Sequence, residues 1–267
     1  MAITGRRSVS LRRMSVFVGH FGSGKTEVAL GVALQAAERG EAVTLVDLDV
    51  VKPFFRCRAL GPRLEGRGVR IVTPDGECAP TEMPVVPPDL PGLLLRAGSR
   101  VIVDVGGDPV GALVFGAVAE ALPRAEVELL LVLNFARAKT DSVEGAVAMA
   151  RAIEAAARLP LTGLVANSHL LGETTPETVR EGLLLAEQTA DVLGLPMRLV
   201  AVEERLVGAF PPGFAPCPVL PLRRLVYPPF ERMPESPVSP GRRSVERPIA
   251  LPRRFAPILP ARVGREA

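Results

Sequence analysis

Short runs of apolar residues recur along the chain, and longer amphipathic or alanine-rich segments separate them. The short runs lack polar alternation, as strands do when both faces of a sheet are covered. This pattern predicts an α/β fold with a mostly parallel, doubly wound sheet. The predicted strands span residues 14–19, 42–48, 69–73, 100–105, 127–134, 161–167 and 198–202, and the predicted helices span 26–39, 142–158 and 176–193.

The two ends of the chain differ from its middle in charge. Of the net charge of +3, residues 1–14 contribute +4 and residues 232–267 contribute +5, which leaves −6 on residues 15–231. An acidic middle does not favour nucleic acid as a partner, because a nucleic-acid-binding face would itself carry the positive charge. We expect a basic extension over 1–13, one folded domain over 14–231 and a disordered, Pro/Arg-rich tail over 232–267.

Composition narrows the class of protein further. The chain is 48% apolar and 23% charged, as globular proteins are. Its three cysteines form no C-x-x-C pair and it has two histidines, which argues against a disulfide scaffold or a zinc ribbon. No apolar run reaches the roughly 18 residues of a membrane span, since Asp104 and Asp108 interrupt the best candidate at 101–122. We expect a cytoplasmic protein without a secretory signal or membrane span.

Residues 19–26 read G-H-F-G-S-G-K-T and match the phosphate-binding loop G-x-x-x-x-G-K-[ST]. The match lies between a predicted strand and a predicted helix, where backbone N–H groups and the helix N-terminus attract phosphate. Lys25 is expected to contact the β- and γ-phosphates and to act in catalysis, and the Thr26 hydroxyl to hold Mg²⁺. A glycine-rich turn without a ligand is the alternative. The predicted nucleotide-binding residues here are Gly19, His20, Gly22, Ser23, Gly24, Lys25, Thr26 and Glu27.

Carboxylates end two further predicted strands. Asp104 closes one and begins D-x-x-G, in which the N–H of Gly107 is expected to meet a γ-phosphate. Asp47 and Asp49 close another, at the edge of an open α/β sheet where ligands bind. We predict that Asp47 and Asp104 support the metal and that Asp49 orients the attacking water. Solvated strand-end turns are the alternative.

These motifs together resemble the MinD/ParA/CobQ/CobB group of P-loop ATPases, of the SIMIBI class, over about residues 14–203. G-H-F-G-S-G-K-T-E followed by V-D-L-D-V-V-K-P-F-F-R-C-R is similar to a set of small bacterial ATP-binding proteins. The resemblance implies a P-loop NTPase fold that uses ATP and Mg²⁺. It gives Lys25, Thr26, Asp49 and Asp104 the phosphate-lysine, magnesium, water-positioning and Walker B roles.

The chain departs from this group at one position of the loop. Many members carry a second lysine that reaches the partner's phosphates across a dimer, and this chain has His20 there. A neutral imidazole gives at most one donor, so His20 does not favour a dimer that uses a trans lysine. A homodimer as such stays open. One interpretation gives the task of that lysine to Arg56 or Arg58; the alternative places both arginines at the surface or facing a substrate.

Asn167 ends a late strand, where the resemblance places an asparagine that reads the base edge. Its amide can pair with adenine N6 and N7, whereas the following Ser-His-Leu does not supply the aspartate of an N-K-x-D guanine reader. This favours ATP over GTP. Asn134 also closes a strand and could line the same crevice or simply form a turn.

Three functions remain open from the sequence. The first is a Mg²⁺-dependent ATPase that acts as a nucleotide-driven switch on a protein partner. The second is an ATP-dependent small-molecule kinase or amide-forming synthetase, and the third is a GTP-driven metal-insertion chaperone. Missing Cys/His clusters and the missing N-K-x-D weigh against the third.

Overall fold

The computed structural model describes residues 9–49, 60–72, 90–95 and 98–226. All of them belong to one unit, Met1–Arg232, and the second unit, Met233–Ala267, lies outside the described residues. The expected basic extension is therefore described only from residue 9 on, and the expected disordered tail lies outside the described part of the chain.

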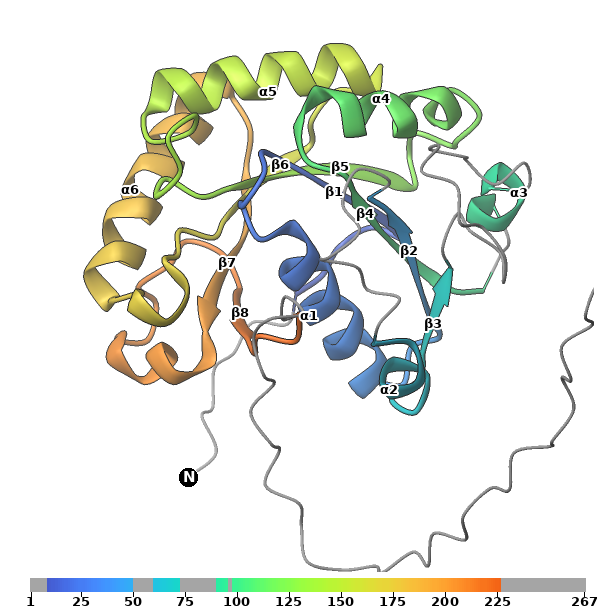
Figure 1. Ribbon diagram of the computed structural model, residues 1–267, viewed down its shortest axis with the longest axis horizontal. Helices are drawn as coiled ribbons and strands as arrows, with labels where there is room; N and C mark the ends of the chain where they lie inside the picture. The colour runs from blue at the N-terminus through green and yellow to red at the C-terminus, as the bar shows by residue number, and fades with distance from the viewer. Residues whose placement is uncertain (1–8, 50–59, 73–89, 96–97, 227–267) are drawn as a thin grey trace, which may run out of the picture. The chain divides into compact units, whose positions relative to one another are not determined.

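An eight-stranded, fully parallel sheet forms the centre of the described unit, in the order β3-β2-β4-β1-β5-β6-β7-β8 (Figure 1). β1 lies between β4 and β5, so the sheet grows first to one side of β1 and then to the other. The predicted α/β doubly wound P-loop NTPase fold is thus confirmed. The strands are β1 (Met14–Val18), β2 (Val43–Leu48), β3 (Val69–Val72), β4 (Arg100–Val105), β5 (Val127–Leu133), β6 (Gly163–Ala166), β7 (Met197–Glu203) and β8 (Val219–Leu222).

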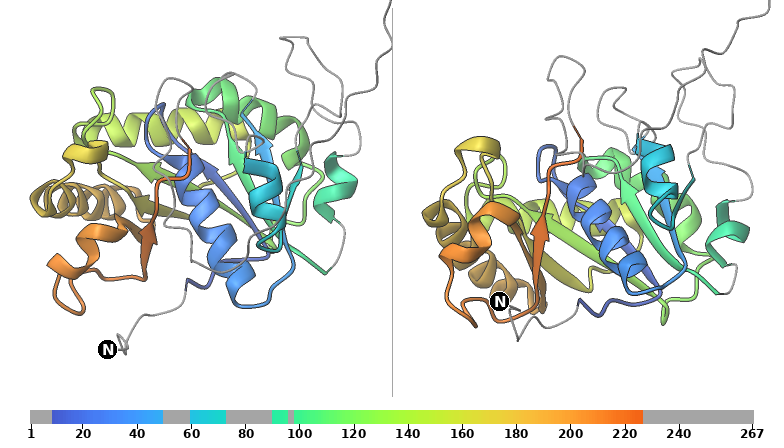
Figure 2. Two further views of the ribbon diagram at one scale, coloured as in Figure 1. Left: turned by 60° about the horizontal axis from the view of Figure 1, so that its bottom comes forward. Right: turned by 90° about the horizontal axis from the view of Figure 1, so that it is seen from below.

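Helices cover both faces of this sheet (Figures 1 and 2). Consecutive residues of β1 show the reason, since Val16 and Val18 belong to one buried cluster and Phe17 to the other. The cluster with Phe17 contains α1 and α2, and the opposite cluster contains α4, α5 and α6. The helices are α1 (Lys25–Glu38), α2 (Gly61–Glu65), α3 (Leu90–Leu95), α4 (Asp108–Ala119), α5 (Val143–Ala157) and α6 (Pro176–Leu193), with 3-10 turns η2 (Leu171–Glu173) and η3 (Glu204–Ala209).

The predicted elements agree with the observed ones to within about two residues at each end. α6 begins with Pro176 after the capping residue Thr175 and ends at the left-handed Gly194, where its cap signals place it. The apolar segment 101–122 contains β4 and α4, and α4 was not predicted as a helix. Among the helices that the structure describes, none is long and apolar enough to cross a membrane.

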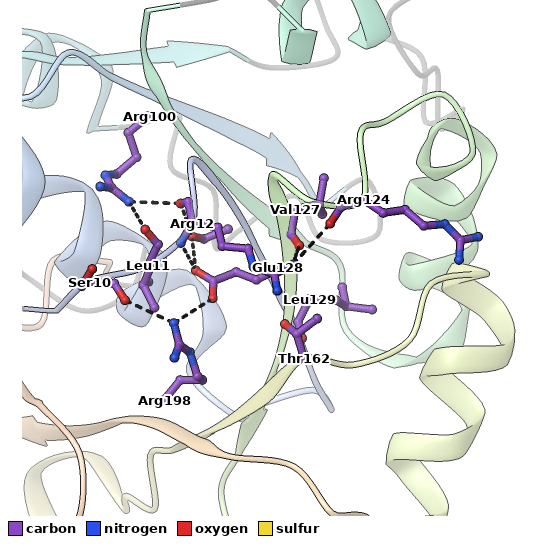
Figure 3. Close-up of polar contacts among 11 residues, drawn as sticks. Ser10, Leu11, Arg12, Arg100, Arg124, Val127, Glu128, Leu129, Thr162 and Arg198 are labelled. Atoms are coloured by element: carbon purple, nitrogen blue, oxygen red, sulfur yellow. Dashed lines mark hydrogen bonds and ion pairs between the residues drawn. The ribbon is translucent and has the colours of Figure 1, made fainter.

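The edge of the sheet where the strands begin is held together by a buried glutamate on β5 (Figure 3). Glu128 Oε1 accepts the Arg12 N–H at 2.7 Å and the Ser15 hydroxyl at 2.8 Å. Glu128 Oε2 accepts from the Arg198 guanidinium at 3.4 Å, and Arg198 also donates to Ser10 O. These contacts bind the segment before β1 to the N-terminal ends of β5 and β7.

Candidate functional site

The loop between β1 and α1 has a backbone that only glycine allows at two positions. A Cβ on Gly19 would lie 2.4 Å from the Val132 carbonyl oxygen. Gly24 is the left-handed N-cap of α1, with φ 83°, and its Cβ would lie 2.3 Å from Asn167 Nδ2. Both glycines therefore hold the loop close to the carboxyl ends of β5 and β6, as phosphate loops require.

Lys25 lies inside this loop with 5% of its surface exposed. Its ammonium is 3.5 Å from the His20 carbonyl oxygen. A buried ammonium is costly unless oxygen atoms surround it. The position suits the predicted contact with phosphate oxygens.

The three predicted aspartates meet beside Lys25, at the carboxyl ends of neighbouring strands. Asp47 and Asp104 are direct partners in the β2–β4 pairing, and Asp47 Oδ1 accepts the Asp49 N–H at 3.0 Å. Burial and the nearby Asp47 charge raise the pKa of Asp104 to about 7, against the lowering effects of Lys25 and the Thr26 hydroxyl. The structure thus brings together side chains that are up to 79 residues apart in the sequence, from Lys25 to Asp104.

Several buried polar atoms of this region have no hydrogen-bond partner among the described residues. Of the four buried side-chain N or O atoms without a hydrogen bond in the described part of the chain, three are Ser23 Oγ, Asp104 Oδ1 and His169 Nε2. The fourth, on Arg13, is elsewhere. Buried polar groups are nearly always satisfied, so unsatisfied ones gathered at one place indicate where a ligand or ion supplies the partners.

The D-x-x-G turn after β4 lies against both the loop and Asp49. A Cβ on Gly106 would be 3.1 Å from Asp49 Oδ1, and a Cβ on Gly107 would be 3.4 Å from Lys25 Nζ and 3.2 Å from Phe21 N. Gly107 therefore lies beside the loop of residues 19–26, and its expected contact with a γ-phosphate stays a prediction.

Side chains from the ends of β5 and β6 brace the outer side of the loop. The Asn134 amide and Arg137 Nε each donate to the Gly22 carbonyl at 3.1 Å. The Asn167 amide donates to the Ser23 carbonyl at 2.7 Å. Asn167 is thus engaged with the loop, and its expected base-reading role stays a prediction. Arg137 was not predicted, because no local motif marks it.

A pocket with a volume of about 270 Å³ begins at Gly24. The residues lining it include Asn167 and His169 after β6 and Glu203 at the end of β7. Burial lowers the pKa of His169 to about 4, as does the positive charge of Arg137, so the imidazole is neutral near pH 7. The pocket offers apolar surface together with amide, imidazole and carboxylate groups next to the loop. The complete lining is Gly24, Glu27, Asn167, His169, Leu171, Gly172, Thr174, Glu203, Leu222, Arg223 and Arg224.

His20, which replaces the second lysine, turns toward its own loop. Its Nδ1 accepts the Phe21 N–H at 2.6 Å, and its carbonyl oxygen accepts the Ser23 N–H at 3.1 Å. Arg56 and Arg58, the other candidates for that lysine's task, lie outside the described residues.

The donor set at this site fits Mg²⁺. No group of three or more His, Cys, Asp or Glu side chains that could hold a metal occurs among the described residues. Mg²⁺ does not need such a cage, because it keeps several waters and is bound by one or two carboxylates together with substrate phosphates. Thr26, Asp47 and the unpartnered Asp104 oxygen offer such oxygen ligands.

Comparison with known proteins shows similarity in fold. No family model and no curated protein matches the chain. The cell division protein FtsY of Thermotoga maritima is 18% identical, with a TM-score of 0.49 over 76% of this chain and 66% of FtsY. The signal recognition particle 54 kDa protein of Aeropyrum pernix K1, in complex with GDP, is 20% identical, with a TM-score of 0.49 over 73% of this chain and 42% of its own.

A third structure, FlhF complexed with GTP and Mg²⁺, is 15% identical, with a TM-score of 0.43 over 72% of this chain and 66% of FlhF. The chain therefore spans between 42% and 66% of the length of these three proteins. None of the three is a MinD or ParA protein.

Proposed function

We propose that this protein is a Mg²⁺-dependent nucleoside triphosphatase that binds its nucleotide at the loop formed by residues 19–26. The observation that carries the proposal is that a buried lysine and three buried aspartates lie together near side-chain oxygen and nitrogen atoms that have no hydrogen-bond partner among the described residues. A triphosphate with its metal would supply negative charge beside Lys25 and partners for the unsatisfied Ser23 and Asp104 oxygens.

Each group has a distinct task in this proposal. Mg²⁺, when bound with the nucleotide, neutralises charge on the phosphate oxygens. Thr26 and Asp104 would hold it, with Asp47 behind them. Lys25 balances the remaining phosphate charge, and Asp49, packed against Gly106, is in position to orient a water.

We further propose that the protein acts as a nucleotide-driven switch, which the D-x-D and D-x-x-G motifs at the ends of β2 and β4 motivate. Gly107 lies between the β4 strand end and the loop, so a γ-phosphate at the loop would meet its N–H. Loss of that phosphate would release the D-x-x-G turn and change the surface offered to a partner or to a second copy.

ATP is the proposed nucleotide. The support comes from residues 167–170, which read N-S-H-L and lack the carboxylate of an N-K-x-D guanine reader. Tighter binding of GTP than of ATP would overturn this part and leave the nucleotide site itself intact.

The test is an equilibrium titration of the full chain with Mg·ATP and Mg·GTP, followed by phosphate release. We expect Lys25→Ala to weaken binding by at least about 100-fold, since it removes a charge-assisted contact to phosphate from a buried position. Lys139→Ala, which removes an exposed lysine, is the matched control and should bind as the wild type does. Wild-type protein that binds neither nucleotide contradicts the proposal.

A further inference from the structure

The segment that follows β8 packs against the helix that begins at the phosphate loop. We call residues 223–226 the C-terminal strap. A Cβ on Gly31 of α1 would lie only 2.7 Å from Leu222 Cδ2, so the end of β8 and α1 are in close contact. Val226, at the far end of the strap, is buried at 8% exposure in the cluster that contains α1. The strap is therefore part of the packed unit.

Glu27 fixes the strap through its carboxylate. Oε1 accepts the N–H groups of Leu225 at 3.0 Å and Val226 at 2.8 Å, and Oε2 accepts the Leu225 N–H at 3.1 Å. Burial raises the pKa of Glu27 to about 7. Above that pH its carboxylate is ionised, and hydrogen bonds to an ionised acceptor are among the strong ones in proteins. Because Glu27 directly follows Thr26, this contact joins the strap to the first turn after the loop.

The strap also forms part of the pocket that begins at Gly24. Arg223 and Arg224 line it together with Asn167 and His169. The volume of about 270 Å³ is close to the roughly 300 Å³ at which small-molecule sites begin, which suits a base and ribose better than a whole nucleotide. A guanidinium can stack on a base and contact a ribose hydroxyl.

We propose that the C-terminal strap is a wall of the nucleoside part of the nucleotide site and that Glu27 is the residue that positions this wall. The proposal rests on the proposed function, because it takes the phosphates to lie on residues 19–26. The ligand is then a purine nucleoside triphosphate whose phosphates contact the loop and whose nucleoside contacts the strap. Glu27 positions the strap and does not touch the reacting atoms.

The test compares three ligands that share a triphosphate group: two carry a nucleoside and the third, tripolyphosphate, carries none. Affinities of Mg·ATP, Mg·GTP and Mg·tripolyphosphate are measured for the wild type, Glu27→Ala and Glu27→Gln. We expect Glu27→Ala to weaken the better-bound nucleotide by at least about tenfold and Glu27→Gln by less, because a glutamine oxygen still accepts from the strap. Tripolyphosphate affinity should stay within about twofold, because that ligand uses only the loop.

Glu38→Gln is the matched control, since Glu38 lies on the same helix and its carboxylate is exposed. This substitution should change neither the affinity for nucleotide nor the affinity for tripolyphosphate. Equal losses for nucleotide and tripolyphosphate, or no loss for either, contradict the role of the strap. Wild-type protein that binds neither ligand contradicts the proposed function and the strap proposal together, so the two failures are distinguishable.

Hydrogen exchange of the wild type tests the same proposal without any substitution. Nucleotide should slow exchange at the Leu225 and Val226 amides by at least about fivefold, whereas tripolyphosphate should leave both rates unchanged. Equal protection by the two ligands contradicts the assignment of the strap to the nucleoside.

Discussion

A carboxylate is buried to the same extent at each end of the parallel strands, at the edge where they begin and at the edge where they finish. The two carboxylates differ in their hydrogen-bond partners. Asp104 lies near the C-terminal end of β4 and Glu128 near the N-terminal end of β5, and each is 1% exposed. At the edge where strands begin, both Glu128 oxygens accept hydrogen bonds from the protein (Figure 3). At the opposite edge, Asp104 Oδ1 has no partner among the described residues, and Asp47 lies directly beside it.

This difference is the one expected between a structural carboxylate and a carboxylate that binds a metal, which is the role that we propose for Asp104. Removing a buried carboxylate whose oxygens are all hydrogen-bonded is costly, because it leaves buried donors without an acceptor. A buried charge next to a like charge and short of donors destabilises the folded state until a cation or phosphate-bound metal arrives. Burial alone does not distinguish the two, whereas their hydrogen-bond partners do.

The largest effect is expected at the satisfied edge. Glu128→Ala leaves the Arg12 N–H, the Ser15 hydroxyl and a guanidinium group without their acceptor, so we expect a loss of about 3 to 5 kcal/mol in the free energy of unfolding. Urea unfolding measures it. The control Glu126→Ala removes a half-exposed partner of Arg13 and should cost less than about 1 kcal/mol. Similar losses in the free energy of unfolding for both variants would show that the hydrogen bonds of Glu128 do not make it a structural carboxylate.

Asp104→Asn is expected to act in the opposite direction. Folding raises the pKa of Asp104 to about 7, so the folded state holds the proton more tightly and the wild type loses stability as pH rises toward and through 7. Without metal or nucleotide, the free energy of unfolding of the variant should exceed that of the wild type by about 4 kcal/mol at pH 8 and by less at pH 5. It should also lose Mg²⁺-dependent nucleotide binding. A variant less stable than the wild type at pH 8 would contradict this interpretation of Asp104.

His169 should make the folded state less stable as pH falls, whereas Asp104 makes it less stable as pH rises. The pKa of His169 falls to about 4 on folding, so its contribution is present above pH 6.5 and is lost as pH falls through 4. Relative to His169→Gln, the wild type should lose about 3 kcal/mol of stability between pH 7 and pH 4. Unfolding curves across that range measure the slope. Parallel curves for the two proteins would show that the imidazole titrates normally in the folded state.

Much of this site could be predicted because local signals mark it. Apolar runs locate the strands, and a glycine-rich loop after one strand and polar residues ending two others locate Lys25 and the aspartates. Other residues depend on contacts far apart in the sequence, such as Arg137 with Gly22 at a separation of 115 and Glu27 with Leu225 at 198. No periodicity or capping signal records such contacts. For the same reason β8 is absent from the strands predicted from the sequence, and the strap was not foreseen.

The smallest effect on stability, with a clear effect on turnover, is expected at the turn that connects the aspartates to the loop. A Cβ on Gly107 would lie 3.4 Å from Lys25 Nζ and 3.2 Å from Phe21 N, whereas Gly208 has open space around it. Gly107→Ala should change the free energy of unfolding by less than about 1 kcal/mol and slow phosphate release by about tenfold, since small displacements at reacting groups are costly. Its affinity for nucleoside diphosphate should stay unchanged, because the γ-phosphate that meets Gly107 is missing there. Gly208→Ala should alter none of these quantities. Equal turnover of the two variants would show that Gly107 does not belong to the site. The site would then consist of the loop and the aspartates alone.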